Sequence, residues 1–274
     1  MIFRLLHHLK KRRDLIDYNM RRWQDNIFFV LVEPKEPGNV GASARAIKNM
    51  GFLNLCLVKP QYEMTEEGRW FARNAHDVLD SAQIYGTVAD AIRDKAIIVG
   101  TTRRIGKKRG LIFPVEQGVR TIFERASHND TIAILFGRES KGLLNEEVAE
   151  CGFLLTIPCS KIQPSLNLSH AVLITSYELS KAEFVSQSPV SLTRSSMSET
   201  PSTGLVPHEA LSNLYGKISS ILQRIEYIPT GDRDIEKKIM TNLKHFIGRA
   251  GLTDWELKML HGLCSQIEKK TVKK

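Results

Sequence analysis

The feature that most constrains this chain is a regular alternation of short apolar runs with segments of helical character. The apolar runs lie at residues 26–32, 53–58, 96–100, 131–136 and 153–157. Runs that are apolar throughout are typical of strands buried on both faces of a parallel sheet. Helical patterns separate them at 39–50, 66–75, 88–93, 115–126, 146–151 and 166–184. The sequence therefore predicts an α/β fold, a parallel sheet flanked by helices.

Outside this α/β segment the composition changes in three places. Residues 1–25 are basic, and we expect them to be a poorly ordered chain end, with an RNA-contacting arm as the alternative. Residues 185–206 are rich in Ser, Thr and Pro, as expected of a linker. Residues 207–274 hold three amphipathic helical stretches. The predicted organisation is thus an extension at 1–25, an α/β domain at 26–184, a linker at 185–206 and a small all-helical domain at 207–274.

The charge balance favours a polyanionic partner. The chain has 39 basic and 30 acidic residues and a net charge of +9, which suits RNA or DNA. It has neither an apolar run long enough to span a membrane nor the pattern of a secretory signal, so we expect a cytoplasmic protein.

We expect reduced thiols and no metal site, because no cysteine belongs to a CxxC pair or stands beside a His cluster. The four cysteines are Cys56, Cys151, Cys159 and Cys264.

Three segments carry residues suited to chemistry, and the first follows the first predicted strand. It runs from Pro37 to Ala46 and places Asn39, Gly41 and Arg45 at a strand-to-helix turn. Glycines at such a turn let the backbone approach a ligand, and a helix N-terminus attracts anions. Taken alone, the segment is equally consistent with a tight turn that has no ligand.

The other two segments also follow predicted strands. The second reads FGRESKGL and includes Arg138 and Glu139, which are costly to bury unless they are paired or bound to a ligand. Ligands of parallel sheets bind beyond the carboxyl ends of the strands, where this loop is expected. The third reads QPSLNL and opens the last long helix, with Ser165 as the expected N-cap and Asn167 as a donor and acceptor. A surface ion pair and an ordinary helix start are the simpler interpretations of each segment alone.

Taken together, the three segments resemble the motifs of the SpoU/TrmH-type SPOUT family of RNA 2′-O-methyltransferases. That family has an N-x-G-A-x-x-R turn, an F-G-x-E-x-x-G-L loop and an S-L-N-L helix start, and this chain has NVGASAR, FGRESKGL and SLNL. The resemblance covers residues 26–184. It continues more weakly into the C-terminal helices, which are similar to those of the TrmJ branch, whose members methylate nucleotide 32 of the tRNA anticodon loop. It implies a deep C-terminal trefoil knot, an S-adenosyl-L-methionine cofactor, a tRNA substrate and a homodimer.

The resemblance also implies roles for individual residues. The family gives the central role to Arg45, either as a base or, as its permanent charge favours, as a group that positions and polarises the hydroxyl. The other implied catalytic residues are Asn39, Glu139, Ser165 and Asn167. The implied cofactor-binding residues are Thr101, Thr102, Arg103, Gly137, Ile157, Pro164, Ser165 and Leu166. A basic run, expected to contact RNA phosphates, consists of Arg103, Arg104, Lys107, Lys108 and Arg109.

Two other functions are compatible with the same motifs. A ribosomal RNA 2′-O-methyltransferase of this superfamily would share the fold and the chemistry. The helical C-terminal region argues against it, because many such enzymes carry an N-terminal RNA-binding domain instead. A non-catalytic RNA-binding scaffold would share only the fold, and intact Arg45, Glu139, Ser165 and Asn167 argue against that function.

Overall fold

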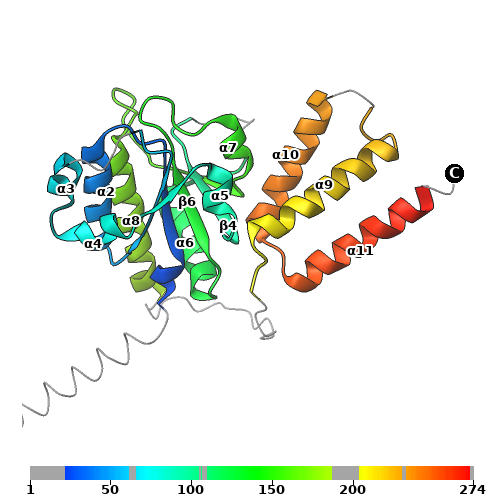
Figure 1. Ribbon diagram of the computed structural model, residues 1–274, viewed down its shortest axis with the longest axis horizontal. Helices are drawn as coiled ribbons and strands as arrows, with labels where there is room; N and C mark the ends of the chain where they lie inside the picture. Colours follow the sequence, from blue (N-terminus) through cyan, green and yellow to red (C-terminus); the bar gives the residue numbers. More distant parts are fainter. Residues whose placement is uncertain are drawn as a thin grey trace, which may run out of the picture.

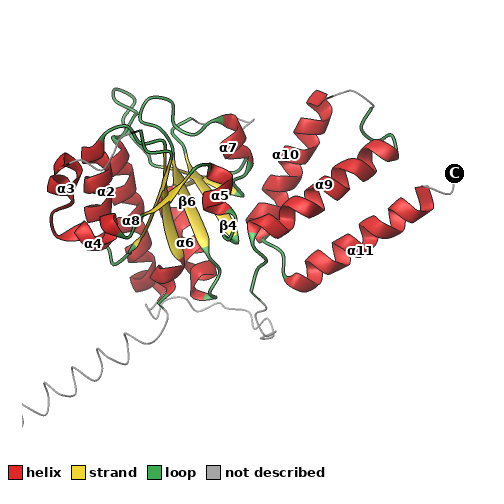
Figure 2. Cartoon of the chain, viewed as in Figure 1, coloured by secondary structure: helices red, strands yellow, loops and turns green. Residues whose placement is uncertain are grey.

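The computed structural model describes residues 22–61, 66–104, 106, 110–186, 204–229 and 233–271. An α/β unit stands beside a group of three helices (Figures 1 and 2). Most of the predicted extension at 1–25 and of the predicted linker at 185–206 lies outside the described residues. No helix in the described part of the chain is long and apolar enough to cross a membrane.

The described α/β unit contains a seven-stranded sheet in which all neighbours run parallel, in the order β3-β2-β1-β6-β4-β7-β5. The strands are β1 (Ile27–Val32), β2 (Asn54–Val58), β3 (Gln83–Tyr85), β4 (Ile97–Thr101), β5 (Ile112–Pro114), β6 (Ile132–Phe136) and β7 (Phe153–Thr156). The five predicted strands are confirmed to within one residue at each end. The sequence missed β3 and β5, which are three residues long and partly exposed, and so lack a buried apolar run.

Helices cover both faces of the sheet. One face carries α2 (Pro37–Asn49), α6 (Val115–Ser127) and α8 (Leu168–Ser186), and the other carries α5 (Val88–Ile92) and α7 (Asn145–Ala149). On β1, Phe29 and Leu31 pack into the first core while Val30 and Val32 pack into the second. This two-sided burial is why the central strands are apolar without alternation.

The predicted helix at 66–75 is wrong in its continuity. It is found as α3 (Glu66–Ala72), a 3-10 turn at Arg73–Ala75 and α4 (His76–Asp80), all packed outside α2. Arg73 has a φ of 50°, in the left-handed region, and this interrupts the helix. A helix continues only while successive residues keep helical backbone angles and hydrogen bonds. The pattern of apolar residues does not report those angles, so it did not reveal the break.

The order of strands places β7 between β4 and β5, although β4 and β5 follow each other directly in the sequence. Thr101 of β4 and Phe113 of β5 both pair with Leu155 of β7. After β7 the chain turns back into α8, which packs against α2 and α6. The late insertion of β7 between two earlier strands is consistent with the predicted trefoil knot.

The C-terminal helices α9 (His208–Arg224), α10 (Arg233–Ala250) and α11 (Asp254–Thr271) form their own small core, and they also contact the α/β unit. Backbone N–H groups at the start of α9 donate to carbonyl groups that precede β4, as in His208 N to Lys95 O at 2.8 Å. The α/β unit and α10 touch at Gly152 and Gly248, where a Cβ on Gly152 would lie 2.2 Å from a backbone oxygen. Glu150, just after α7, accepts hydrogen bonds from His208 and Lys244.

Candidate active site

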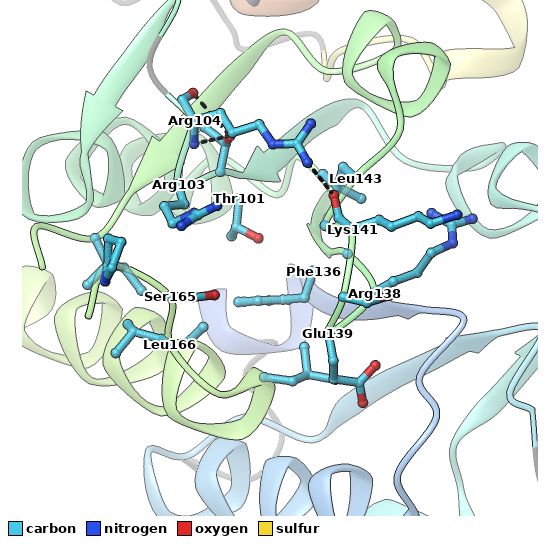
Figure 3. Close-up of a pocket in the computed structure, with 18 of the residues that line it drawn as sticks. Thr101, Arg103, Arg104, Phe136, Arg138, Glu139, Lys141, Leu143, Ser165 and Leu166 are labelled. Carbon is cyan, nitrogen blue, oxygen red and sulfur yellow. Dashed lines mark hydrogen bonds between the residues drawn. The ribbon is translucent and has the colours of Figure 1, made fainter. Parts of the chain in front are cut away.

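A cavity opens at the carboxyl ends of β4, β6 and β7, where ligands of parallel sheets bind. The segments that follow these three strands and the start of α8 form its wall (Figure 3). The predicted residues among those that line it are Thr101, Thr102, Arg103, Arg104, Gly137, Glu139, Ile157, Pro164, Ser165 and Leu166. Three loops that are distant in sequence are therefore brought to one place.

The loop after β6 is a tight turn that only glycine permits at two positions. A Cβ on Gly137 would lie 2.1 Å from the backbone carbon of Gly142, which leaves no room for any side chain. Gly142 itself has a φ of 66°, which L residues rarely adopt. Its N–H donates to the carbonyl of Arg138 at 2.8 Å and closes the turn. The backbone of this loop can therefore lie close to whatever occupies the cavity.

Glu139 lies at the cavity edge in a short chain of polar contacts. Its carboxylate accepts hydrogen bonds from Nδ2 of Asn39 at 3.2 Å and from the backbone N–H of Lys35 at 3.3 Å. Nδ2 of Asn167 donates to Oδ1 of Asn39 at 2.8 Å, which fixes the orientation of the Asn39 amide. The three motifs are thus connected by direct contacts between Asn39, Glu139 and Asn167.

Asn167, rather than Ser165, caps α8. Its Oδ1 accepts hydrogen bonds from the backbone N–H of Ser169 at 2.8 Å and from the Ser169 hydroxyl at 2.7 Å. The helix begins at Leu168, so the predicted cap at Ser165 is wrong. An asparagine side chain satisfies a free helix N–H as well as a serine does, and here it leaves Ser165 free to line the cavity.

Arg138 is among the residues that line the cavity, and its guanidinium extends away from the middle of it (Figure 3). There it joins the carboxylates of Glu33 and Glu147. Its guanidinium donates to both oxygens of Glu33, at 2.6 and 2.8 Å, and to Glu147 at 3.0 Å. The hydrogen bond from Arg138 lowers the pKa of Glu33, against a smaller effect of burial. Oε2 of Glu147 also accepts the backbone N–H of Leu144, at the start of α7, at 2.7 Å. The loop after β6 is therefore attached both to the end of β1 and to α7.

The cavity wall combines apolar side chains with cationic groups. The side chains of Leu155, Ile157 and Leu166 offer surfaces suited to a flat apolar ring. Arg103, Arg104 and Lys141 bring positive charge to the wall, and Arg104 donates to the Lys141 carbonyl at 3.4 Å across the opening. No group of His, Cys, Asp and Glu able to hold a metal is found among the described residues.

Residues 26–177 match the SpoU rRNA Methylase family. The chain belongs to that family. A second model, the C-terminal domain of the tRNA methyltransferase TrmJ, matches residues 209–274 and thus the three C-terminal helices. Both parts of this SpoU family member therefore have counterparts in known proteins.

Named relatives of this SpoU family member share most of its length. The tRNA (cytidine/uridine/adenosine-2'-O-)-methyltransferase TrmJ of Pseudomonas aeruginosa is 30% identical over 246 residues, which cover 89% of this chain and 95% of the relative. The tRNA (cytidine/uridine-2'-O-)-methyltransferase TrmJ of Salmonella typhimurium is 33% identical over 89% of this chain and 96% of its own. The crystal structure of TrmJ from Z. mobilis superposes with a TM-score of 0.71 at 28% identity, and covers 88% of this chain and 98% of that one.

Of the five predicted catalytic residues, Glu139 and Ser165 line the cavity. Asn39 and Asn167 do not line it, but they are connected to Glu139 by hydrogen bonds. Arg45 is exposed on α2, and it is not among the residues that line the cavity. Lys107, Lys108 and Arg109 lie outside the described residues, so only Arg103 and Arg104 of the basic run are placed.

Sequence reasoning missed several residues that shape the site. Glu33 and Glu147 contact Arg138, Lys35 contacts Glu139, and Cys159 lines the cavity. The buried charge of Arg138 did signal that a partner must exist. The identity of that partner was hidden, because Glu33 lies 105 positions away in the sequence.

Proposed function

We propose that this chain transfers the methyl group of S-adenosyl-L-methionine to a ribose 2′-hydroxyl of tRNA, at nucleotide 32 of the anticodon loop. The observation that carries the proposal is the direct contact of Glu139, Asn39 and Asn167 at the edge of a cavity beyond the strand ends. TrmJ relatives that align over about nine tenths of the chain support tRNA as the substrate. The TrmJ-type C-terminal helices support it as well.

The cavity fits the proposed cofactor by the chemistry of its wall. Leu155, Ile157 and Leu166 would enclose the adenine ring, and the backbone of the loops would read its edge. Arg103 or Lys141 would pair with the carboxylate of the amino-acid part. The bound cofactor would supply a methyl group on a positively charged sulfur: attack of the ribose oxygen on the methyl carbon would break the carbon–sulfur bond and release a neutral thioether, and the hydroxyl proton would pass to water.

The chain must align the ribose and stabilise the charge that develops on its oxygen. Glu139 faces the cavity, where its negative charge would favour a positively charged ligand. Asn39, which Asn167 orients, donates a hydrogen bond to that carboxylate, and Ser165 offers a hydroxyl at the cavity wall. A guanidinium near the ribose would stabilise the developing alkoxide, which is the proposed role of Arg45.

We propose that Arg45 acts on the active site of a partner subunit in a homodimer. Arg45 lies on α2, outside the cavity of its own chain, and α2 packs against α8. Two large side chains one helical turn apart on α8 are exposed, Leu173 by 38% and Tyr177 by 48%. Covering these two side chains would remove apolar surface from water, which favours association. A second copy seated there would bury them and bring its own Arg45 toward the site.

Positive charge near the cavity suits the phosphates of an RNA substrate. Arg103 and Arg104 follow β4 at the cavity rim, and the chain as a whole carries a net charge of +9. Contacts of this kind position RNA without reading its sequence. We therefore propose that these two residues contact tRNA, in the cytoplasm where tRNA is used.

The proposal is tested with radiolabelled S-adenosyl-L-methionine and unmodified tRNA transcripts, followed by nuclease mapping of the label. We expect label at the ribose of nucleotide 32, and a loss of at least about 100-fold in rate for Arg45→Ala. Arg120→Ala is the matched control, because Arg120 is an exposed helical arginine on α6, away from the cavity. Label on ribosomal RNA alone would replace the tRNA assignment, and the absence of both label and cofactor binding would favour a non-catalytic scaffold.

A further inference from the structure

Arg138 and Glu139, neighbours in the loop after β6, form hydrogen bonds to the chain that follows β1, including the first turn of α2. Glu139 reaches the N–H of Lys35 and the side chain of Asn39, on the cavity side. Arg138 reaches Glu33 on the opposite side, and Glu147 completes the contact from α7. The family motifs explain why Glu139 is present, but they leave the ion cluster of Glu33, Arg138 and Glu147 without a role.

The contact distances differ between Glu139 and Arg138, and they indicate which residue sets the distance between this loop and β1. The contacts of Glu139 measure 3.2 to 3.4 Å, at the long end of the range for hydrogen bonds. The contacts of Arg138 measure 2.6 to 3.0 Å and include a bidentate guanidinium–carboxylate pair, the stronger and more directional kind. We infer that the ion cluster mainly sets the distance between the loop and β1. The position of Glu139 relative to Lys35 and Asn39 then follows from that distance.

Burial makes this attachment stiff. The side chain of Arg138 is 9% exposed, that of Glu147 is 8% exposed and that of Glu33 is 26% exposed. Ion pairs with so little solvent are hard to break singly, because the remaining charge would be left uncompensated. Neither Arg138 nor Glu147 can therefore swing away without disturbing the loop that ends at Leu144.

The backbone at Glu33 supports the same conclusion. Its φ of 46° lies in the left-handed region, which residues other than glycine rarely adopt. The N–H of Glu33 donates to the carbonyl of Val58 at 2.7 Å, which holds this turn at the end of β1. Unfavourable backbone conformations of this kind persist where the surrounding structure over-determines them, and they concentrate at functional sites.

We propose that Glu33 and Glu147, through Arg138, are positioning residues for methyl transfer: they set the place of Glu139 relative to Asn39 and the cavity. The proposal rests on the proposed function, because the reaction that the cluster would serve is the one proposed there. A positioning role predicts that loss of Glu33 or Glu147 slows the chemical step and leaves the affinity for the cofactor nearly intact. Neither residue lines the cavity, and the turn that does keeps its own hydrogen bond from Gly142 to Arg138.

The test uses the full chain with Glu33→Gln, which removes one charge and keeps the size of the side chain. We expect kcat for tRNA methylation to fall by about 10- to 100-fold, because a misplacement of the order of 1 Å costs roughly that much. The Kd for S-adenosyl-L-methionine, measured by calorimetry, should stay within about threefold. Glu147→Gln is the second variant in case Glu33→Gln folds poorly, since its amide oxygen can still accept the Leu144 N–H.

The matched control is Asp80→Asn, which breaks another arginine–carboxylate pair of the α/β unit, that of Arg69 and Asp80, on the exposed surface near α3. We expect kcat to change by less than about twofold, because exposed pairs contribute little. A purely structural role of the cluster would lower the kcat of Glu33→Gln by a similar factor with and without Glu139. We expect instead that Glu33→Gln has almost no further effect in a Glu139→Gln background.

Amide hydrogen exchange at Gly142 gives a readout that does not depend on activity. We expect this exchange to accelerate in Glu33→Gln, because the loop loses its attachment to β1. Unchanged exchange, or a kcat within about twofold of that of the unaltered chain, would overturn the positioning role. An unaltered chain that binds cofactor but methylates no tRNA would refute the proposed function instead, while faster exchange in the variant would still support the attachment.

Discussion

The turn after β6 gives the sharpest prediction from packing alone. In Gly137→Ala the new methyl group would lie 2.1 Å from the Gly142 carbon and 2.2 Å from the Leu143 nitrogen, both of them backbone atoms. The opposite side of the turn must therefore retreat by roughly 1 Å or more before normal contact returns. Gly137 has no left-handed φ in the structure, so the cost comes from steric overlap and not from the backbone conformation of the alanine.

Overpacking of this kind destabilises a protein by about 1–3 kcal/mol, and the displaced residues line the cavity. We expect a lower melting temperature and at least a tenfold higher Kd for S-adenosyl-L-methionine by calorimetry. The matched control is Gly216→Ala on the exposed side of α9, where nothing lies within 4 Å of the new methyl group. That substitution should stabilise the chain by about 0.5–1 kcal/mol. Wild-type cofactor affinity in Gly137→Ala would show that this loop does not shape the cofactor site.

Three further predictions follow from contacts in the structure. Asn167→Ala should lower the free energy of unfolding by about 1 kcal/mol in urea titrations through loss of the helix cap, whereas Asn167→Asp should keep the cap and lose activity with the donor to Asn39. Burial would raise the pKa of Glu150, but hydrogen bonds from His208 and Lys244 outweigh it and hold that pKa at about 2. Glu150 therefore contributes stability above its usual value of 4.5, and this is lost as the pH falls toward 2, so Glu150→Gln should flatten the dependence of stability on pH in that window. Cys159 is exposed at the cavity while the other three cysteines are buried, so a thiol reagent should modify one group quickly and bound cofactor should slow that reaction. Fast labelling that cofactor leaves unchanged would place the ligand elsewhere.

Much of the fold could be predicted because its strands are buried on both faces. β1, β4 and β6 have interior neighbours on every side, so burial forced their sequences to be apolar. The same logic fails at β3, whose residues Gln83 and Ile84 are exposed and carry no such pattern. β3 belongs to the sheet because its backbone pairs with β2, and side chains contribute little to that pairing.

The candidate site was predictable as a set of loops but not as a set of contacts. The sequence placed Asn39, Glu139 and Asn167 at successive strand ends, and the structure joins them by hydrogen bonds. It gave no sign that Glu33 would pair with Arg138, because an ion pair needs only complementary charge and leaves no periodic pattern. The position of Arg45 is likewise a property of helix packing around α2, which no local motif encodes.

The place of β7 in the sheet also dictates an order of events during synthesis. Strand β5 pairs with β7 alone among the described strands, so Ile112 leaves the ribosome long before its partner Leu154 exists. Until then β5 has no neighbour to hold it, and the sheet ends at β4. The cavity is incomplete in the same way, because Thr101 and Gly137 are synthesised before Ile157 and Ser165, which form the rest of its wall. A nascent chain that stops before β7 would therefore contain six of the seven described strands and only part of the cavity.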